Sequence, residues 1–314
     1  MNSQTFDFCN EPETPIKKVF LFADERKKVS DRWEYHCILI VEENYLEKFI
    51  NGLLNDRSQV KYYREMKFSE INNKGIGEKY ELAKKWITRL IFEASEPNSG
   101  IYFTVCGIDR DKIDFSRFGD GDSPEGKYAN LYNRFFRSTI IGALHLYFPN
   151  HNVIVKQIYH DQQGHLEEHK YFEWHIAKKI MEETSDITFE NDRVVFVCSD
   201  HDREETEKVA SHCIQYVDIL IGAITYCLHI TNRKHKGQKK VAEAILPLLQ
   251  EILYRGVRKP MSFNTYRKFT VSNFPVDRVT KEDVLFRKGD YFQPSCKAFE
   301  DYLSKQEDLV GLFD

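Results

Sequence analysis

The sequence predicts an α/β fold in which helices pack on the faces of a mixed β-sheet. Short apolar runs rich in β-branched and aromatic residues are typical of buried strands, and longer stretches with a helical repeat lie between and after them. Two strands come first, and strands then alternate with helices. This order favours a mixed sheet flanked by helices.

Five segments have the composition of buried or half-buried strands. Residues 19–23 begin the series, and residues 35–41 follow closely enough to form a hairpin with them. The other three segments are residues 101–108, 153–159 and 194–198. Helical patterns cover residues 45–55, 78–92, 127–147, 167–184 and 205–230.

The chain divides into a core and an extension. Its 314 residues exceed the roughly 150 of an average domain. Because the composition changes near Arg233, we predict a core over residues 1–232 and a C-terminal extension over residues 233–314. The extension opens with a basic segment, continues in an amphipathic helix over residues 239–254 and ends in a tail rich in Phe and Tyr.

Composition favours an ordered, cytoplasmic protein without a membrane span. Hydrophobic residues make up 41% and aromatic residues 14%, which excludes a disordered chain. The 7 cysteines form no C-x-x-C pair and most lie in apolar runs, as expected for reduced thiols of a cytosolic protein. The acidic N-terminal stretch lacks the apolar region of a secretory signal. The most apolar uncharged stretch, residues 219–232, is shorter than the roughly 20 residues of a membrane span.

Acidic residues follow several of the predicted strands. Asp24 and Glu25 come directly after the first strand, and Asp161 follows the strand at 153–159. Since side chains alternate along a strand, Asp24 and Asp161 each share a face with the aromatic residue two positions earlier. Asp is also a favoured turn residue, which is the ordinary explanation for any one of these acids and the one we prefer for Asp109.

Asp218 is the most informative single acid. It is the only Asp, Glu, Lys or Arg from Val209 to Asn232, in a helical segment that is apolar on nearly every face. Burying an isolated carboxylate costs several kcal/mol unless it is paired, protonated or bound to a metal. An ion pair with an arginine from another helix is the structural alternative to a functional role.

These acids lie in segments that resemble the bacterial ribonuclease H-like family called domain of unknown function 3800. The resemblance covers roughly residues 17–223, about two thirds of the chain. Its four segments are a strand ending in Asp24-Glu25, the run Glu65-Met66-Lys67-Phe68-Ser69, a strand ending in Asp161, and a Gln215-x-x-Asp218 helix with a small-residue turn at Gly222. The chain departs from the family in carrying Arg26-Lys27 where Ser-Gly is usual, and Val217 where Ala is usual.

The resemblance implies a ribonuclease H-like mixed sheet flanked by helices, with helical insertions and a C-terminal extension. It also implies a nuclease that uses two Mg²⁺ or Mn²⁺ ions, since hard cations prefer carboxylate and water oxygens. By this resemblance Asp24 would bridge both ions, Asp161 and Asp218 would hold one each, and Glu65 would complete the set. Auxiliary candidates are Glu25, Lys67 and Asp200. A role in bacterial defence against phage follows by family analogy.

The basic segment is the predicted contact for nucleic acid, DNA or RNA. Lys and Arg number 45 against 49 Asp and Glu, so the net charge is −4 and a polyanion must bind a local patch. A solvated connector would have the same composition. The predicted phosphate contacts are Arg233, Lys234, Lys236, Lys239 and Lys240, and the predicted base-stacking residues are Tyr254, Phe263, Tyr266 and Phe269.

Other functions are compatible with the same sequence. A non-catalytic module that binds nucleic acid or protein would keep the fold without a metal. A zinc hydrolase ranks third: residues 165–169 match the pattern H-x-x-E-H, but so short a pattern arises easily by chance. A homodimer or a complex with a partner protein is also compatible with the sequence.

Overall fold

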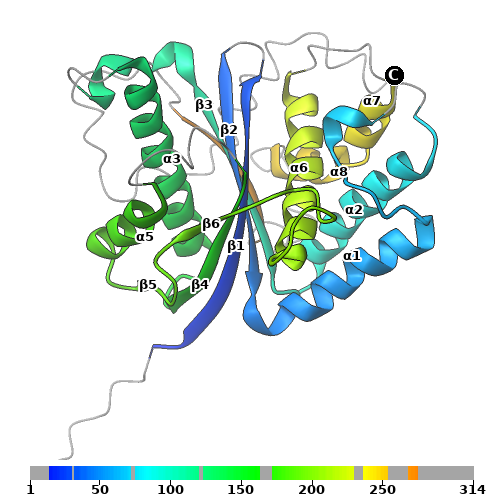
Figure 1. The fold of residues 1–314 in the computed structure, drawn as a ribbon, viewed down its shortest axis with the longest axis horizontal. Helices are drawn as coiled ribbons and strands as arrows, with labels where there is room; N and C mark the ends of the chain where they lie inside the picture. The colour runs from blue at the N-terminus through cyan, green and yellow to red at the C-terminus, as the bar shows by residue number, and fades with distance from the viewer. Residues whose placement is uncertain are drawn as a thin grey trace, which may run out of the picture.

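Seven strands form one mixed sheet in the computed structural model, which describes residues 14–29, 32–71, 75–119, 123–162, 172–229, 236–253 and 268–274. The strand order is β5-β4-β1-β2-β3-β7, and β6 also pairs with β4 (Figure 1). The α/β class with a mixed sheet is therefore confirmed. The strands are β1 (Ile16–Val29), β2 (Trp33–Glu42), β3 (Ile101–Asp109), β4 (Asn152–Asp161), β5 (Ile187–Phe189), β6 (Val194–Val197) and β7 (Phe269–Phe274).

The first three strands form an antiparallel meander, as the predicted hairpin requires. On the other side of β1, β4 runs parallel to it, and β5 and β6 run parallel to successive parts of β4. β7 lies parallel to β3. The sequence prediction missed β5 and β7, because β5 is only 3 residues long and β7 lies in the aromatic tail.

Helices cover both faces of the sheet (Figure 1). Alternation along β1 serves both faces, since Leu21 packs with the helices of one face and Phe22 with those of the other. The α3 face carries α3 (Pro124–Tyr147) and α5 (Phe172–Glu183). The α6 face carries α1 (Leu46–Val60), α2 (Glu78–Ser95), α6 (Lys208–His229), α7 (Lys236–Glu243) and α8 (Leu246–Leu253).

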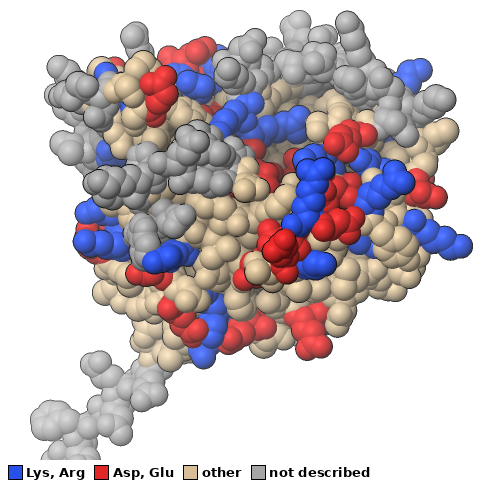
Figure 2. All heavy atoms as spheres, in the orientation of Figure 1, with Lys and Arg blue, Asp and Glu red and all other residues tan. Residues whose placement is uncertain are grey.

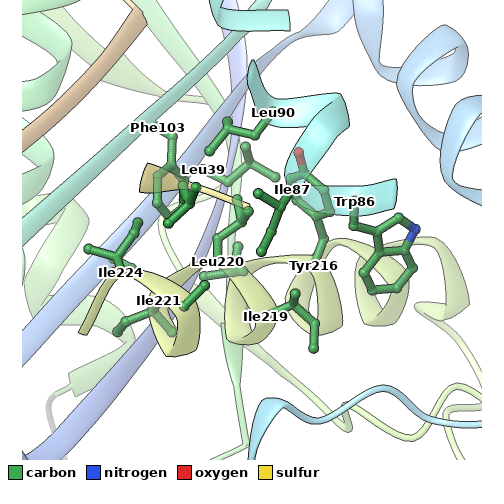
Figure 3. Packing of buried hydrophobic residues seen from close by; sticks show 14 of the residues in the cluster. Leu39, Trp86, Ile87, Leu90, Phe103, Tyr216, Ile219, Leu220, Ile221 and Ile224 are labelled. Atoms are coloured by element: carbon green, nitrogen blue, oxygen red, sulfur yellow. The ribbon is translucent and has the colours of Figure 1, made fainter. Parts of the chain in front are cut away.

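α6 is the central helix of the α6 face. Its Tyr216 packs edge to face on Trp86 of α2, with ring centroids 5.8 Å apart, and Leu220 lies among Leu39 of β2 and Phe103 of β3 (Figure 3). Among the described residues, α6 is also the one helix long and apolar enough to cross a membrane. Since 83% of its most apolar stretch is buried inside the protein, α6 has the burial typical of a core helix.

Most predicted helices are present with shifted ends. α3 begins three residues earlier than predicted because Ser123 caps it: the Ser123 hydroxyl accepts the N–H of Gly126 at 3.1 Å. The single helix predicted over residues 239–254 is instead two helices, α7 and α8. Pro247 lies in the first turn of α8, where proline is tolerated, and it would break a continuous helix. Of the helix predicted at 167–184, only the part from Phe172 lies within the described residues.

The predicted extension contributes a strand and two helices to the core. Phe269 of β7 is buried and stacks on Phe103 of β3, with ring centroids 5.8 Å apart. The prediction that Phe269 stacks on bases is therefore wrong, while Tyr254, Phe263 and Tyr266 lie outside the described residues. Beside β7, the Lys268 ammonium donates to the backbone carbonyl oxygens of Glu96, Pro97 and Ser99.

Candidate functional site

Asp24 lies in the middle of β1. The strand does not end at this acid, as the sequence prediction had it, because β1 pairs with β2 as far as Val29 opposite Trp33. Asp24 shares the α6 face with Phe22 and is only 5% exposed. Its Oδ1 accepts the N–H of Glu25 at 2.8 Å. The side chain therefore lies under α6 and away from a turn.

Asp161 is the last residue of β4 and lies beside Asp24. Ala23 opposite His160 is the last pair of the β1–β4 ladder, so the two acids follow on neighbouring parallel strands. Two residues before them, Phe22 and Tyr159 stack with ring centroids 5.3 Å apart on the α6 face. Because side chains alternate on both strands, Asp24 and Asp161 also lie on that face.

Asp218 is the one residue of α6 between Ala210 and Thr225 that is not fully buried. Its Oδ2 accepts the N–H of Phe68 at 2.7 Å. One turn further along α6, the ring of Phe68 packs directly on Gly222, where a Cβ atom would overlap the ring. Gly222 therefore lies inside the helix and does not form the predicted turn. The isolated acid of this apolar helix faces the site and not the core.

Gln215 joins three separate segments at the site. Its Oε1 accepts the N–H of Met66 at 2.8 Å and the guanidinium of Arg57 in α1 at 2.5 Å. Its Nε2 donates to the carbonyl oxygen of Ser199 at 2.5 Å. Since Gln215 is fully buried, its amide has no access to water and depends on these hydrogen bonds. The Gln-x-x-Asp pattern thus fixes the segment 65–68 to α6.

Glu65 reaches the site through this segment. Its Oε1 accepts the Ser199 hydroxyl at 2.7 Å and pairs with the Lys67 ammonium at 2.9 Å. The Glu65 carboxylate raises the pKa of Asp218, and the Lys67 ammonium lowers it. Glu65 and Lys67 therefore lie at the border of the acidic group.

The three aspartates lie on the same face of the sheet, and burial and mutual repulsion affect their pKa values. Burial raises the pKa of Asp24 well above its ordinary value, and repulsion from Asp161 and Asp218 raises it further. Burial and repulsion from Asp218 raise the pKa of Asp161 to about 7. Burial also raises the pKa of Asp218, against hydrogen bonding by the Phe68 N–H. We call Asp24, Asp161 and Asp218 the acidic triad.

Arg26 is a site residue that the sequence prediction missed. It follows Asp24 by two positions on β1, and its guanidinium lies over the Phe68 ring, 5.4 Å from the centroid. Burial lowers the pKa of Arg26, and attraction to Asp218 and Asp24 opposes that shift. Alternation along β1 was the signal that could have found it. Arg26 offsets part of the triad's charge, yet the pKa of each of the three acids remains raised.

Two auxiliary candidates lie outside the triad. Glu25 points to the α3 face, where its carboxylate pairs with Lys27 at 2.8 Å and accepts the Tyr132 hydroxyl. Asp200 pairs with the Arg203 side chain at 3.1 Å and accepts the Asp202 N–H. In the described structure, the partners of both carboxylates lie outside the triad.

The described part of the basic segment lies beside the site. Gln238 of α7 donates to the backbone carbonyl oxygens of Phe68 and Ser69, so α7 packs on the segment that Asp218 holds. Lys236 and Lys240 are exposed, and Lys239 lies 3.7 Å from the Glu243 carboxylate. Arg233 and Lys234 lie outside the described residues. Acidic and basic side chains crowd together over the middle of the molecule, in front of β1 and α6 (Figure 2).

The donor set of the acidic triad fits Mg²⁺ or Mn²⁺. All donors are carboxylate oxygens, and the hydrogen bonds that Asp24 and Asp218 accept from described residues come from single backbone N–H groups, which leaves each an oxygen for a cation. Among the described residues, no group of three His, Cys, Asp or Glu side chains is arranged to hold a metal ion as it stands. The histidines of the H-x-x-E-H pattern lie outside the described residues.

Comparisons with protein-family models, with curated proteins and with solved structures give no match. The site brings three repelling carboxylates, a fourth at their border and two cationic side chains to one place on the α6 face.

Proposed function

We propose that the protein is a divalent-metal-dependent nuclease that hydrolyses phosphodiester bonds of DNA or RNA. The observation that carries the proposal is the convergence of Asp24, Asp161 and Asp218 from two strands and a helix, with mutual repulsion that raises the pKa of Asp24 and Asp161. Carboxylates that repel one another destabilise a fold near neutral pH. Such a group favours a functional role over a structural one.

The ribonuclease H-like class is part of the proposal. It is supported by the strand order β3-β2-β1-β4, in which β1 to β3 are antiparallel and β4 is parallel to β1. It is also supported by the origin of the acids, which come from the first strand, a later strand and a packed helix. Membership of the family that the motifs resemble, a cytoplasmic location and a role in defence belong to the same proposal.

Each site residue has a role in this proposal. Asp24, Asp161 and Asp218 would hold the metal, with Glu65 completing the set. Two such ions, when bound, supply an activated water and stabilise the leaving oxygen of a phosphoryl displacement. Arg26 and Lys67 place positive charge beside the acids, where a phosphate of the substrate is attracted. The described lysines of α7 would bind neighbouring phosphates.

The substitution Asp24→Asn tests the proposal. Wild-type protein with MnCl₂ is incubated with labelled single- and double-stranded DNA and RNA. We expect the wild type to cleave at least one of these substrates and Asp24→Asn to lose about 100-fold or more of that rate. The melting temperature should not fall, because the amide removes a repelling charge. The matched control is Asp186→Asn, since Asp186 is a half-exposed acid that pairs with His145 away from the triad.

Binding of nucleic acid without cleavage would support the alternative function. If the wild type cleaves none of these substrates but binds one of them in a salt-dependent manner, the protein is a nucleic-acid-binding module on the same fold. Absence of both cleavage and binding rejects the proposal.

A further inference from the structure

A second polar group lies on the α3 face, directly behind the acidic triad. Glu25 follows Asp24 on β1, and His160 precedes Asp161 on β4, so alternation turns both side chains away from the triad. Both side chains are almost completely buried, with 1% of Glu25 and 0% of His160 exposed. The two strands that carry the front acids are thus also linked at their back.

Tyr132 of α3 joins Glu25 to His160. Its hydroxyl donates to Glu25 Oε2 at 2.8 Å and lies 2.6 Å from His160 Nε2. Glu25 Oε2 and His160 Nε2 are themselves 3.5 Å apart. At the other side of the ring, His160 Nδ1 donates to the backbone carbonyl oxygen of Asp161 at 2.7 Å. A continuous chain of hydrogen bonds therefore runs from β1 through α3 to the backbone of Asp161.

This chain of hydrogen bonds lies where the backbone pairing of β1 with β4 ends. The last pair between β1 and β4 is Ala23 opposite His160, so no ladder pair joins the strands at Asp24 and Asp161. The two front carboxylates repel each other at this point. At Asp161 the ladder partner of β4 is Val197 of β6, so the hydrogen bonds behind the acids are what connects this end of β4 to β1.

We infer that Tyr132 is a positioning residue, which with Glu25 and His160 ties β1 to β4 and fixes the separation of Asp24 and Asp161 for metal binding. The effect on metal binding rests on the proposed function, whereas the link between the strands rests on the hydrogen bonds alone. Because these side chains are buried, removing one of them leaves its hydrogen-bond partners unsatisfied, without water to replace the lost bonds.

The substitution Tyr132→Phe tests the inference, because it removes the hydroxyl and keeps the ring. The matched control is Tyr128→Phe: Tyr128 lies one turn earlier on α3, and its hydroxyl donates to Glu34 at 3.0 Å. Two readouts are taken on the full chain. Hydrogen exchange of the backbone amides of residues 158–162 reports the link itself. Mn²⁺ affinity, measured by electron paramagnetic resonance, reports its effect on the triad.

We expect faster exchange at these amides in Tyr132→Phe and an affinity for Mn²⁺ about tenfold weaker than in the wild type. In a cleavage assay, kcat should fall while KM for the nucleic acid stays the same. Tyr128→Phe should change neither exchange nor Mn²⁺ affinity. His160→Asn, whose amide can still donate to the Asp161 carbonyl, should retain more affinity than His160→Ala.

The two ideas fail in different ways. Unchanged amide exchange in Tyr132→Phe overturns the link, whatever the metal does. Faster exchange with wild-type Mn²⁺ affinity overturns the positioning role. If the wild type itself binds no Mn²⁺, the proposed function fails, and the exchange measurement alone decides whether the link exists.

Discussion

The ring of Phe68 packs directly on Gly222 of α6, with no room for a side chain between them. The same residue donates its backbone N–H to Asp218, one turn earlier on the helix. Gly222 and Asp218, on one side of α6, therefore hold the segment that carries Glu65 and Lys67. The position of Glu65 depends on this close contact between the helix and the loop.

Replacing Gly222 with alanine should lower the stability of the protein. Gly→Ala inside a helix normally stabilises by about 1 kcal/mol, but here the new methyl group would overlap the Phe68 ring. We expect a loss of about 1–3 kcal/mol in the free energy of unfolding, measured in urea. Gly142→Ala, inside the C-terminal half of α3, is the control and should not destabilise. A Gly222→Ala protein more stable than the wild type would show that the segment moves away at no cost.

The metal-free protein should lose stability as the pH rises from about 4 to about 7. The pKa of Asp161 is raised from 3.8 to about 7 in the folded protein. Between these values the folded protein holds a proton that the unfolded chain has released, so the free energy of unfolding falls as the pH rises. The contribution of Asp161 is complete only once the pH is well above 7.

The substitution Asp161→Asn isolates this effect. In urea unfolding with EDTA, the variant should be about 1–3 kcal/mol more stable than the wild type near pH 8 and equal to it near pH 4. Asp186→Asn should show no such difference between the two pH values. Equal stability of Asp161→Asn and the wild type near pH 8 would mean that Asp161 is not repelled by its neighbours.

Lys268→Met should loosen β7. The ammonium of Lys268 donates to three backbone carbonyl oxygens after α2, and the residue is 5% exposed. Methionine keeps the aliphatic length but donates to none of them, which should cost about 1–3 kcal/mol. Hydrogen exchange of the β7 amides and the melting temperature measure the loss. Lys85→Met, at a half-buried lysine whose solvent-exposed hydrogen bond goes to Gln59, is the control and should leave both unchanged.

The lysines of α7 should set the salt dependence of nucleic-acid binding. Replacing Lys236, Lys239 and Lys240 together by alanine should reduce the slope of log affinity against log salt by about 2–3, since each phosphate contact contributes about 0.9. Fluorescence anisotropy over a salt series measures the slope. A triple variant of lysines on α2 and α5, Lys84, Lys85 and Lys178, should keep the wild-type slope. An unchanged slope in the α7 variant would mean that this helix does not contact phosphate.

Local sequence patterns carry part of the information about the acids of the α6 face. The alternation of β1 and β4 placed Asp24 and Asp161 on one face because both strands lie in the same sheet. The lone charge of an apolar helix singled out Asp218, and the structure shows that this position is the one that faces the site. These signals are short-range, since each depends on a single strand or helix.

Contacts between distant segments were beyond the same patterns. Glu25 stood next to Asp24 in sequence, but its burial against Tyr132 and His160 depends on how α3 packs. Phe269 is an aromatic residue in a tail that follows a basic segment, which suggested stacking on bases. Only the pairing of β7 with β3 places it in the core. Neither residue carries a local signal for its partner.

The pairing of β7 with β3 also determines where the chain can be shortened. A protein ending near residue 232 would lose β7 and leave the outer edge of β3 with unpaired N–H and C=O groups, next to the apolar surface that Phe269 and Val271 cover. An open strand of this kind is a template for pairing with other molecules. Truncation before Phe269 should thus produce self-association, whereas a chain that keeps β7 retains the pairing along this edge of β3.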